Sequence, residues 1–194
     1  MSTQPQSRLS PEEYLALERK AEHKSEFYQG ETFAMSGATY RHNLISSNIG
    51  GELRARLRGT ECTALIADMR VATSETGLYT YPDIAVVCGQ PRFRDQELDT
   101  LLNPAVLVEV LSPSTQNYDR GLKFEMYRTI PTLHDYILVA QDRVHVEHHS
   151  RQPDDRWLLW ETNDAVATVV LSSLGIALPL SEIYAGAGFA EFAR

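Results

Sequence analysis

The stretch AVLVEVLSPSTQNYDRGLK, residues 105–123, joins a strongly apolar strand to the start of a helix. Residues 105–112 are aliphatic apart from Glu109 and the closing serine, which is typical of a central strand covered on both faces. A carboxylate in such a strand is costly to bury unless it has a partner, a bound cation or a shifted pKa. Glu109 therefore predicts either a functional site or a buried ion pair.

A second apolar segment, TYPDIAVVCG at residues 80–89, carries a carboxylate of its own, Asp83, near its start. If the two strands are neighbours in one sheet, Asp83 and Glu109 approach each other and repel unless a proton or a cation lies between them. Mg²⁺ prefers oxygen ligands and commonly takes one or two carboxylates while keeping several waters. The pair predicts a site for Mg²⁺, or for Mn²⁺ in its place. The simpler interpretation of Asp83 is a strand-entry residue that bonds local backbone donors.

Lys123 follows Glu109 by 14 positions and lies in the next predicted helix. This set of groups suits phosphoryl chemistry, in which a metal lowers the pKa of a bound water and a lysine orients that water or stabilises developing negative charge. The alternatives are a structural ion pair with Glu109 and a solvated helix lysine that contacts Asp119 at i−4 or Tyr127 at i+4.

The residues before Glu109 predict a helix and then a hairpin. Ser10-Pro11-Glu12-Glu13 has the pattern of a capped helix start, and that helix is expected to run to about Glu22.

SEFYQGETFA, residues 25–34, predicts two strands joined at Gly30. A two-residue turn sets Tyr28 opposite Glu31 and Glu26 opposite Phe33, which places Glu26 and Glu31 on one face of the hairpin. Both carboxylates are candidate site residues, or else solvated residues of the hairpin.

Two further helices are expected. From Arg41 to Arg58 an apolar residue recurs every fourth position, and His42 falls on the same face, pointing inward either as a site residue or as a satisfied core histidine. The second helix follows Ser112-Pro113 and ends before Pro131. Its expected buried face consists of Tyr118, Leu122, Met126 and Ile130.

Strand-like runs fill much of the remaining chain and predict an α/β fold with a mixed sheet and helices packed on it. Besides the two strands above, they are residues 62–67, 69–73, 134–140, 143–150 and 156–162. The polar segment 89–104 is expected to form a loop, and its Arg92 and Arg94 are candidates for substrate contact. His145, Glu147 and His149 alternate along one strand as a rival metal site, but about 13 Å separates the outer two, which favours a solvent-facing polar edge.

Composition narrows the class of protein. The chain has 194 residues, 43% of them hydrophobic, which suits one domain with a substantial core. Its net charge of −8 argues against a strongly basic surface for nucleic acid. Cys62 and Cys88 show no zinc or disulfide pattern and are expected to be buried as small apolar residues. With no apolar leader and no long apolar run, the chain is expected to be cytoplasmic, with no membrane partner.

The motifs SEFYQGE, RHN, YPDIAVV, LVEVLSPST, YDRGLKFEMYR and HDYILV together resemble the Uma-two family of the PD-(D/E)xK nuclease superfamily. The resemblance runs from about Ser10 to about Tyr184 and implies a restriction-endonuclease-like core preceded by a helix and a β-hairpin. It matches Asp83 to the aspartate of the superfamily signature and Glu109 to its second acidic residue. The superfamily's usual lysine position is Leu111 here, so the role passes to Lys123. The resemblance also matches Glu26, Glu31 and His42 to recurrent family positions.

These features predict a Mg²⁺-dependent endonuclease that hydrolyses DNA. Asp83, Glu109 and Glu26 are the expected metal ligands, with Lys123, Glu31 and His42 as further catalytic residues. The alternative is a nuclease-fold protein without catalysis that serves as a binding or assembly module. A homodimer is expected, since two sites related by a two-fold axis cut both strands of a duplex most simply. The expected domain spans residues 10–184, between a flexible N-terminus, 1–9, and a C-terminal tail, 185–194.

Overall fold

A computed structural model describes residues 8–74 and 77–190, and it confirms a mixed α/β fold. The helices are α1 (Pro11–Glu18), α2 (Tyr40–Arg56), α3 (Gln116–Tyr118), α4 (Phe124–Tyr127) and α5 (Leu180–Ile183). The strands are β1 (Ser25–Tyr28), β2 (Glu31–Ala34), β3 (Cys62–Ile66), β4 (Arg70–Ala72), β5 (Tyr79–Thr80), β6 (Ile84–Cys88), β7 (Thr100–Leu101), β8 (Val106–Leu111), β9 (Asp135–Ala140), β10 (Val146–Arg151), β11 (Trp157–Thr162), β12 (Thr168–Leu171) and β13 (Ile176–Pro179).

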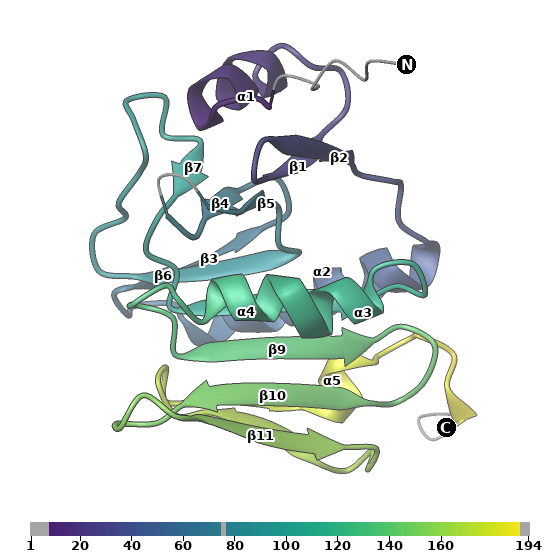
Figure 1. The fold of residues 1–194 in the computed structure, drawn as a ribbon. Coiled ribbons are helices and arrows are strands. Elements are labelled where there is room, and N and C mark those ends of the chain that lie inside the picture. The colour runs from purple at the N-terminus through teal and green to yellow at the C-terminus, as the bar shows by residue number, and fades with distance from the viewer. Residues whose placement is uncertain (1–7, 75–76, 191–194) are drawn as a thin grey trace.

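The central sheet has the strand order β11-β10-β9-β8-β6-β3. Strands β8 and β9 run parallel and the other neighbours antiparallel, so the sheet is mixed, as predicted. Figure 1 shows α3 and α4 across one face of this sheet and α2 behind the other. Covered on both faces, β8 is buried along its whole length, which agrees with its nearly continuous apolar sequence.

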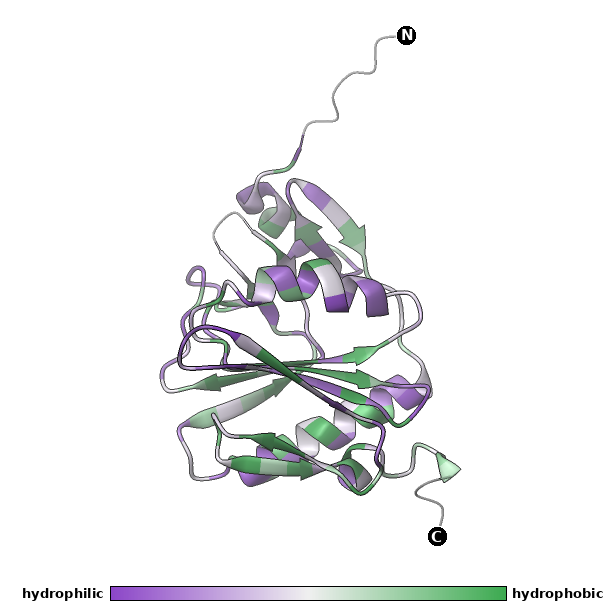
Figure 2. Cartoon of the chain, turned by 60° about the horizontal axis from the view of Figure 1, so that its bottom comes forward, coloured by the Kyte–Doolittle hydropathy of each residue, from purple (hydrophilic) through white to green (hydrophobic). Residues whose placement is uncertain are grey.

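Successive side chains of β6 and β8 point to opposite faces of the central sheet, so the core is divided between these two faces. Val106 and Val108 pack with Ile45 and Ile49 of α2, whereas Leu107 belongs to the cluster beneath α4. The apolar colour in Figure 2 follows the strands of the central sheet, while polar colour gathers on helices and loops. Because side chains alternate with period 2, Glu109 shares the face of Leu107 and points toward α3 and α4.

A second sheet, of order β2-β1-β5-β4-β7, carries the N-terminal hairpin. The predicted register is confirmed, with Tyr28 opposite Glu31 and Glu26 opposite Phe33, and Gly30 turns the chain at φ +89°. The predicted capping box of α1 is also present. That helix ends at Glu18 and not near Glu22, because the Glu18 carboxylate accepts hydrogen bonds from the backbone and hydroxyl of Ser25 in β1.

Two local predictions are wrong. The segment expected as one strand, residues 80–89, is broken: β5 joins the second sheet, β6 joins the central one, and Asp83 lies just before β6. Pro82 explains the break, because it has no N–H to donate to a sheet ladder.

The helix after Ser112-Pro113 presents a face that differs in part from the one expected: Ile130 is buried as predicted, but Tyr118 is only half-buried. Asp119, Lys123 and Tyr127 are buried, while Leu122 and Met126 are only half-buried. Residues 119–123 form one turn of π-helix between α3 and α4, with Gly121 outside helical geometry. The buried carboxylate Glu109 needs a cation, and turning Lys123 inward supplies it, which outweighs burial of more apolar surface.

The cysteine prediction is also wrong. Cys62 and Cys88 form a disulfide between β3 and β6, and both are half-buried. They lie directly opposite each other in the antiparallel register, with a Cα–Cα separation of 4.0 Å. A spacing of 26 residues carries no motif, so only the strand pairing brings the two thiols together.

Reduction of this disulfide is expected to lower the free energy of unfolding by about 2–4 kcal/mol, because the cross-link removes conformational freedom from the unfolded chain. Urea unfolding with and without dithiothreitol measures the difference. The double variant Cys62→Ser/Cys88→Ser is the control and should unfold at one midpoint in both buffers. Equal stability of the oxidised and reduced wild-type protein would contradict the cross-link.

The ends of the chain add two observations. Of the N-terminal segment expected to be flexible, only Arg8 and Leu9 lie within the described residues, and the Leu9 N–H bonds to the carbonyl of Gly30. In the expected tail, Ala187 is buried and the ring of Phe189 packs edge-on against Tyr184. Over the part of the chain that the structure describes, no helix has both the length and the apolarity to cross a membrane.

Candidate active site

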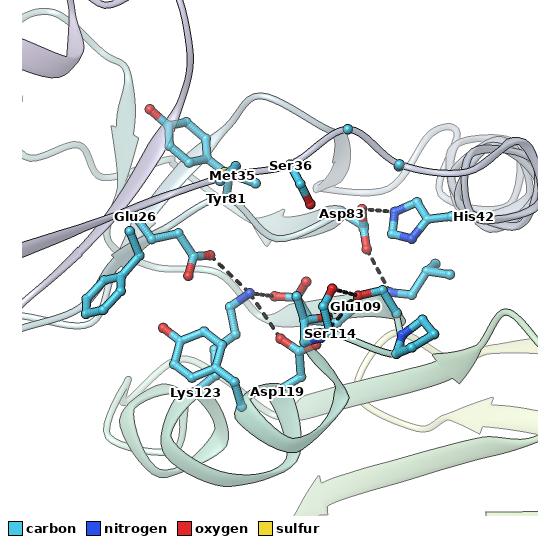
Figure 3. A pocket seen from close by; sticks show the side chains of 18 of the residues that line it. Glu26, Met35, Ser36, His42, Tyr81, Asp83, Glu109, Ser114, Asp119 and Lys123 are labelled. Atoms are coloured by element: carbon cyan, nitrogen blue, oxygen red, sulfur yellow. Dashed lines mark hydrogen bonds and ion pairs between the residues drawn. The ribbon is translucent and has the colours of Figure 1, made fainter.

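The predicted site residues meet at one cavity of about 720 Å³. The hairpin, the segment that leads into α2, the C-terminal end of β8 and the turn into α3 form its walls. Figure 3 shows acidic side chains and Lys123 converging from these separate elements. Five of the six predicted site residues line the cavity: Glu26, His42, Asp83, Glu109 and Lys123.

Asp83 lies at the base of the cavity, held by both of its oxygens. Oδ2 accepts the backbone N–H of Val110 at 2.7 Å, and Oδ1 lies 2.8 Å from Nε2 of His42. An ionised carboxylate only accepts, so the imidazole Nε2–H donates this bond. The register that pairs Ile84 with Val108 brings Asp83 opposite Glu109. The prediction that the two strands are neighbours, which lets Asp83 approach Glu109, is confirmed.

His42 points inward, as its place in the first turn of α2 predicted. Thr39 caps this helix by accepting the backbone N–H of His42 at 3.2 Å, which fixes the start of the helix against the cavity. The His42 side chain is 14% exposed and reaches Asp83 from across the cavity base. Its contact with a carboxylate makes it a positioning residue for Asp83.

Lys123 is the centre of a buried ion cluster. Its Nζ lies 3.0 Å from Oε1 of Glu109, 3.1 Å from Oε1 of Glu26 and 3.3 Å from Oδ1 of Asp119. The lysine side chain is 6% exposed. Tyr127, one turn further along, donates its hydroxyl to Oε1 of Glu109 at 3.0 Å. Lys123 therefore reaches the second acidic residue although it lies on a helix and not on the strand.

The charges in this cluster perturb one another. Burial raises the pKa of Glu109 well above its ordinary value of 4.5, and the nearby ammonium of Lys123 only partly opposes this. Burial likewise raises the pKa of Asp119. For Lys123, burial favours the neutral form, but Glu109, Glu26 and Asp119 outweigh it, so that its pKa is raised well above 10.5. The lysine is thus charged, while the carboxyl groups bind a proton or a further cation readily.

The cavity base carries excess negative charge. Four carboxylates line it, those of Glu26, Asp83, Glu109 and Asp119, against one ammonium and one imidazole. Even with His42 protonated, two negative charges remain uncompensated when all four acids are ionised. Like charges held this close favour binding of a proton or a cation.

The donor set fits a divalent cation held by two carboxylates. Asp83 and Glu109 offer the one or two carboxylate ligands that Mg²⁺ usually takes, with water for the remaining positions. The contacts of Glu109 with Lys123 and Tyr127 both use Oε1, so they leave Oε2 for another partner. Within residues 8–74 and 77–190, no three acidic, imidazole or thiol groups are arranged to hold an ion by themselves.

Glu26 and Glu31 occupy different environments, although they share a face of the hairpin. Glu26 is buried, and its Oε1 binds Lys123 and accepts the hydroxyl of Thr80. Glu31 is exposed near the hairpin turn, and the cavity lining does not include it. The structure thus brings Glu26 into the ion cluster and leaves Glu31 outside it.

Sequence reasoning missed three members of this cluster, Asp119, Tyr127 and Thr80. For Asp119 and Tyr127 the sequence predicts only contact with a solvated lysine, yet both of them and Lys123 are buried. The spacing of Asp119, Lys123 and Tyr127 at i, i+4 and i+8 was the available signal, because it places all three on one helical face. Thr80 had no comparable signal, since its contact with Glu26 depends on pairing between β1 and β5.

The other candidates lie elsewhere. Arg92 and Arg94 do not line the cavity, and Arg94 forms an ion pair with Glu12. Glu147 is buried on β10 and binds Arg120 at 2.7 Å and His145 at 3.1 Å. These three groups form a hydrogen-bonded cluster and not the solvent-facing edge that the alternation favoured.

The ring of His149, the third residue of the rival metal site, packs against Phe124 with a centroid separation of 4.2 Å. Burial lowers the pKa of His149 below its ordinary value of 6.5. The residue therefore belongs to the core beneath α4.

The mixed sheet, the acidic residues of adjacent strands and the lysine define a nuclease-fold protein. The chain belongs to the Uma2 family, described as "Putative restriction endonuclease", whose model matches residues 11–181. Leu111, which the resemblance placed at the superfamily's usual lysine position, is buried in the core, while Nζ of Lys123 lies 3.0 Å from Oε1 of Glu109.

Two proteins from Synechocystis and one solved structure are similar to this chain. Uncharacterized protein sll1609 is 36% identical over 87% of this chain and 95% of its own length. Uncharacterized protein slr1290 is 35% identical over 95% of this chain and 96% of its own length. A crystal structure from Anabaena variabilis, described as "a putative nuclease belonging to DUF820", has a TM-score of 0.75 at 17% identity, with 91% of this chain and 97% of that one covered. The last comparison shows a common fold.

Proposed function

We propose that this protein is a divalent-metal-dependent endonuclease that hydrolyses phosphodiester bonds of DNA. The observation that carries the proposal is the meeting of Asp83 and Glu109 at the base of a cavity with Lys123 beside Glu109. Family membership supports the same class of activity. The excess of carboxylates over cations supports the binding of Mg²⁺, or Mn²⁺, at these two residues.

Each residue has a distinct role in this proposal. Asp83 and Glu109 would hold the cation, which when bound lowers the pKa of a water and polarises the phosphate. Lys123 supplies fixed positive charge next to Glu109, where it orients a nucleophilic water or stabilises charge that develops on phosphate oxygens. His42 orients Asp83 through its bond to Oδ1. Glu26 and Asp119 keep the lysine charged and in place.

The proposal extends to assembly and location. A homodimer with two-fold symmetry would present two such cavities to one DNA molecule. The cytoplasm is the proposed compartment, where reducing conditions would act against the Cys62–Cys88 disulfide. We assign no catalytic role to Glu31, because its carboxylate is exposed near the hairpin turn and away from Lys123.

One observation favours the alternative of a binding or assembly module without catalysis. All three carboxylates that contact Lys123 lie within 3.3 Å of its Nζ, so the cluster is already a closed structural ion network. Metal binding separates the two functions, because a purely structural network has no use for a cation.

Titration of Mn²⁺ into the protein is expected to show one site per chain, with an affinity that falls as the pH is lowered. A ligand carboxyl must lose its proton to bind metal, and burial raises the pKa of Glu109 above 4.5. As the pH is lowered, the affinity for Mn²⁺ therefore begins to fall at a higher pH than it would with an ordinary glutamate as ligand. Calorimetry between about pH 5 and pH 8 measures the trend, with proton release seen as a dependence on buffer ionisation heat.

The control for this titration is Asp142→Asn, which removes an exposed carboxylate paired with Arg143 and should leave the affinity unchanged. Absence of metal binding in the wild-type protein, together with no cleavage of plasmid or single-stranded DNA, would overturn the proposed function.

A further inference from the structure

The reactive groups lie deep in a small cavity. The side chains of Lys123 and Glu109 are 6% and 7% exposed. The cavity that holds them has a volume of about 720 Å³. A phosphodiester group must therefore enter this cavity to reach these side chains.

The cavity offers little positive charge to a nucleic acid backbone. Lys123 is the one lysine, and there is no arginine, among the described residues that line it. Duplex binding usually relies on several lysine and arginine contacts with phosphates. A ligand that places one or two phosphates here, and gains the rest of its affinity from its bases, suits this lining better than a duplex.

One wall supplies surface for such bases. Phe33 lies opposite Glu26 in the hairpin, so that its ring shares the face that carries the ion cluster. Phe33 is 49% exposed and Met35, just beyond the same strand, is 39% exposed, yet both line the cavity. Tyr28 lines it from the neighbouring strand. Aromatic side chains stack on unpaired bases, and thioethers make favourable contacts with aromatic rings.

The facing wall supplies neutral hydrogen-bonding groups. The hydroxyl of Ser112 lies 2.9 Å from those of both Ser114 and Thr115, and all three residues line the cavity at the turn that follows β8. Hydroxyls both donate and accept, so they suit sugar, phosphate and base-edge atoms without adding charge. An apolar wall and a hydroxyl wall therefore flank the ion cluster.

We propose that the site accepts an unpaired strand of DNA, with a base stacked on Phe33 and the adjoining phosphate next to Lys123, and that it does not accept an intact duplex. This inference rests on the proposed nuclease function for its chemical step, while the binding preference stands on the cavity alone. The specificity-determining residue is Phe33, which contacts the base and not the reacting phosphate.

The first test compares one labelled oligonucleotide alone and annealed to its complement, in Mg²⁺ and in Mn²⁺. The single strand is expected to be cut about tenfold faster or more, because the duplex must first be unpaired. Equal or faster cutting of the duplex would overturn the inference and leave the nuclease function intact.

The second test measures binding of the same two ligands by fluorescence anisotropy, in the Asp83→Asn background so that no substrate is consumed. Phe33→Ala is expected to weaken single-strand binding about tenfold, the effect of one lost base stack. Trp160→Ala is the matched control, since Trp160 is an exposed aromatic residue of β11 that does not line the cavity.

Together the two tests distinguish failure of the proposed nuclease function from failure of the inferred preference for single-stranded DNA. Selective, Phe33-dependent binding of the single strand without any cleavage would refute the nuclease function and support the binding inference. Binding that prefers the duplex, or that Phe33→Ala and Trp160→Ala weaken equally, would refute the inference whether or not cleavage occurs.

Discussion

Asp83→Asn is expected to reduce metal-dependent DNA cleavage about a thousandfold. A bound metal stabilises the transition state by several kcal/mol, and each 1.36 kcal/mol corresponds to a factor of ten in rate. Asparagine keeps the shape of the side chain and an oxygen that accepts the N–H of Val110, but it removes the negative charge that attracts a cation. The rate of cleavage of single-stranded DNA in Mg²⁺ and the affinity for Mn²⁺ should fall together.

Two comparisons make this result specific. His42→Ala leaves the carboxylate but removes the hydrogen bond to its Oδ1, so a smaller loss of about 10- to 100-fold is expected, as for other residues that orient a ligand. Asp142→Asn removes an exposed carboxylate outside the cavity and should cleave at the wild-type rate. If Asp83→Asn, folded by circular dichroism, retains cleavage within tenfold of wild type, Asp83 does not hold the catalytic metal.

Lys123→Met is expected to lower the free energy of unfolding by about 3–5 kcal/mol, the usual cost of removing one partner from a buried ion pair. Methionine fills a similar volume, so the loss arises from carboxylates left without a cation. The pKa of Lys123 is raised on folding above 10.5. Its stabilising contribution is therefore fully present below pH 10.5 and is lost only as the pH rises through the raised value, so neutral pH is the proper condition for urea unfolding.

The variant should regain stability as the pH is lowered. Without the ammonium, the buried carboxyl of Glu109 binds a proton more tightly in the folded state than in the unfolded chain, and such a group stabilises the fold as the pH falls. Adding Glu109→Gln should restore part of the loss at neutral pH. Lys24→Met is the matched control: the pair of Lys24 with Asp68 is exposed and worth at most about 1 kcal/mol. A loss of the same small size for Lys123→Met would mean that the cluster does not stabilise the fold.

Sequence patterns predicted the parts of this site that depend on local periodicity and on simple charge arguments. Glu109 was identified as an expensive residue in an apolar strand, and Asp83 as its counterpart on a second apolar segment. The two-residue turn at Gly30 predicted the register that sets Glu26 opposite Phe33. Each of these inferences uses only the period of a strand and the cost of an uncompensated charge.

The remaining features depend on contacts between distant segments. The half-burial of Leu122 and Met126 follows from the demand of Glu109 for a cation, and Glu109 lies on a different element from that helix. The pairing of Cys62 with Cys88 follows from the register of β3 and β6. In both cases a tertiary contact overrides what the local sequence favours.

Lys123 joins segments that differ greatly in their distance along the chain. Asp119 is one helical turn away, whereas Glu26 is 97 positions earlier (123 − 26), on the hairpin. Closing the longer loop costs more chain entropy. The contact that offsets this cost forms only when the hairpin docks. The contact with Glu26 is therefore expected to form after the folding transition state, so that Lys123→Met shortens the lifetime of the native protein more than it slows refolding. In a chevron plot for Lys123→Met, the unfolding limb should therefore shift more than the folding limb. That result would show that the contact with Glu26 forms late in folding.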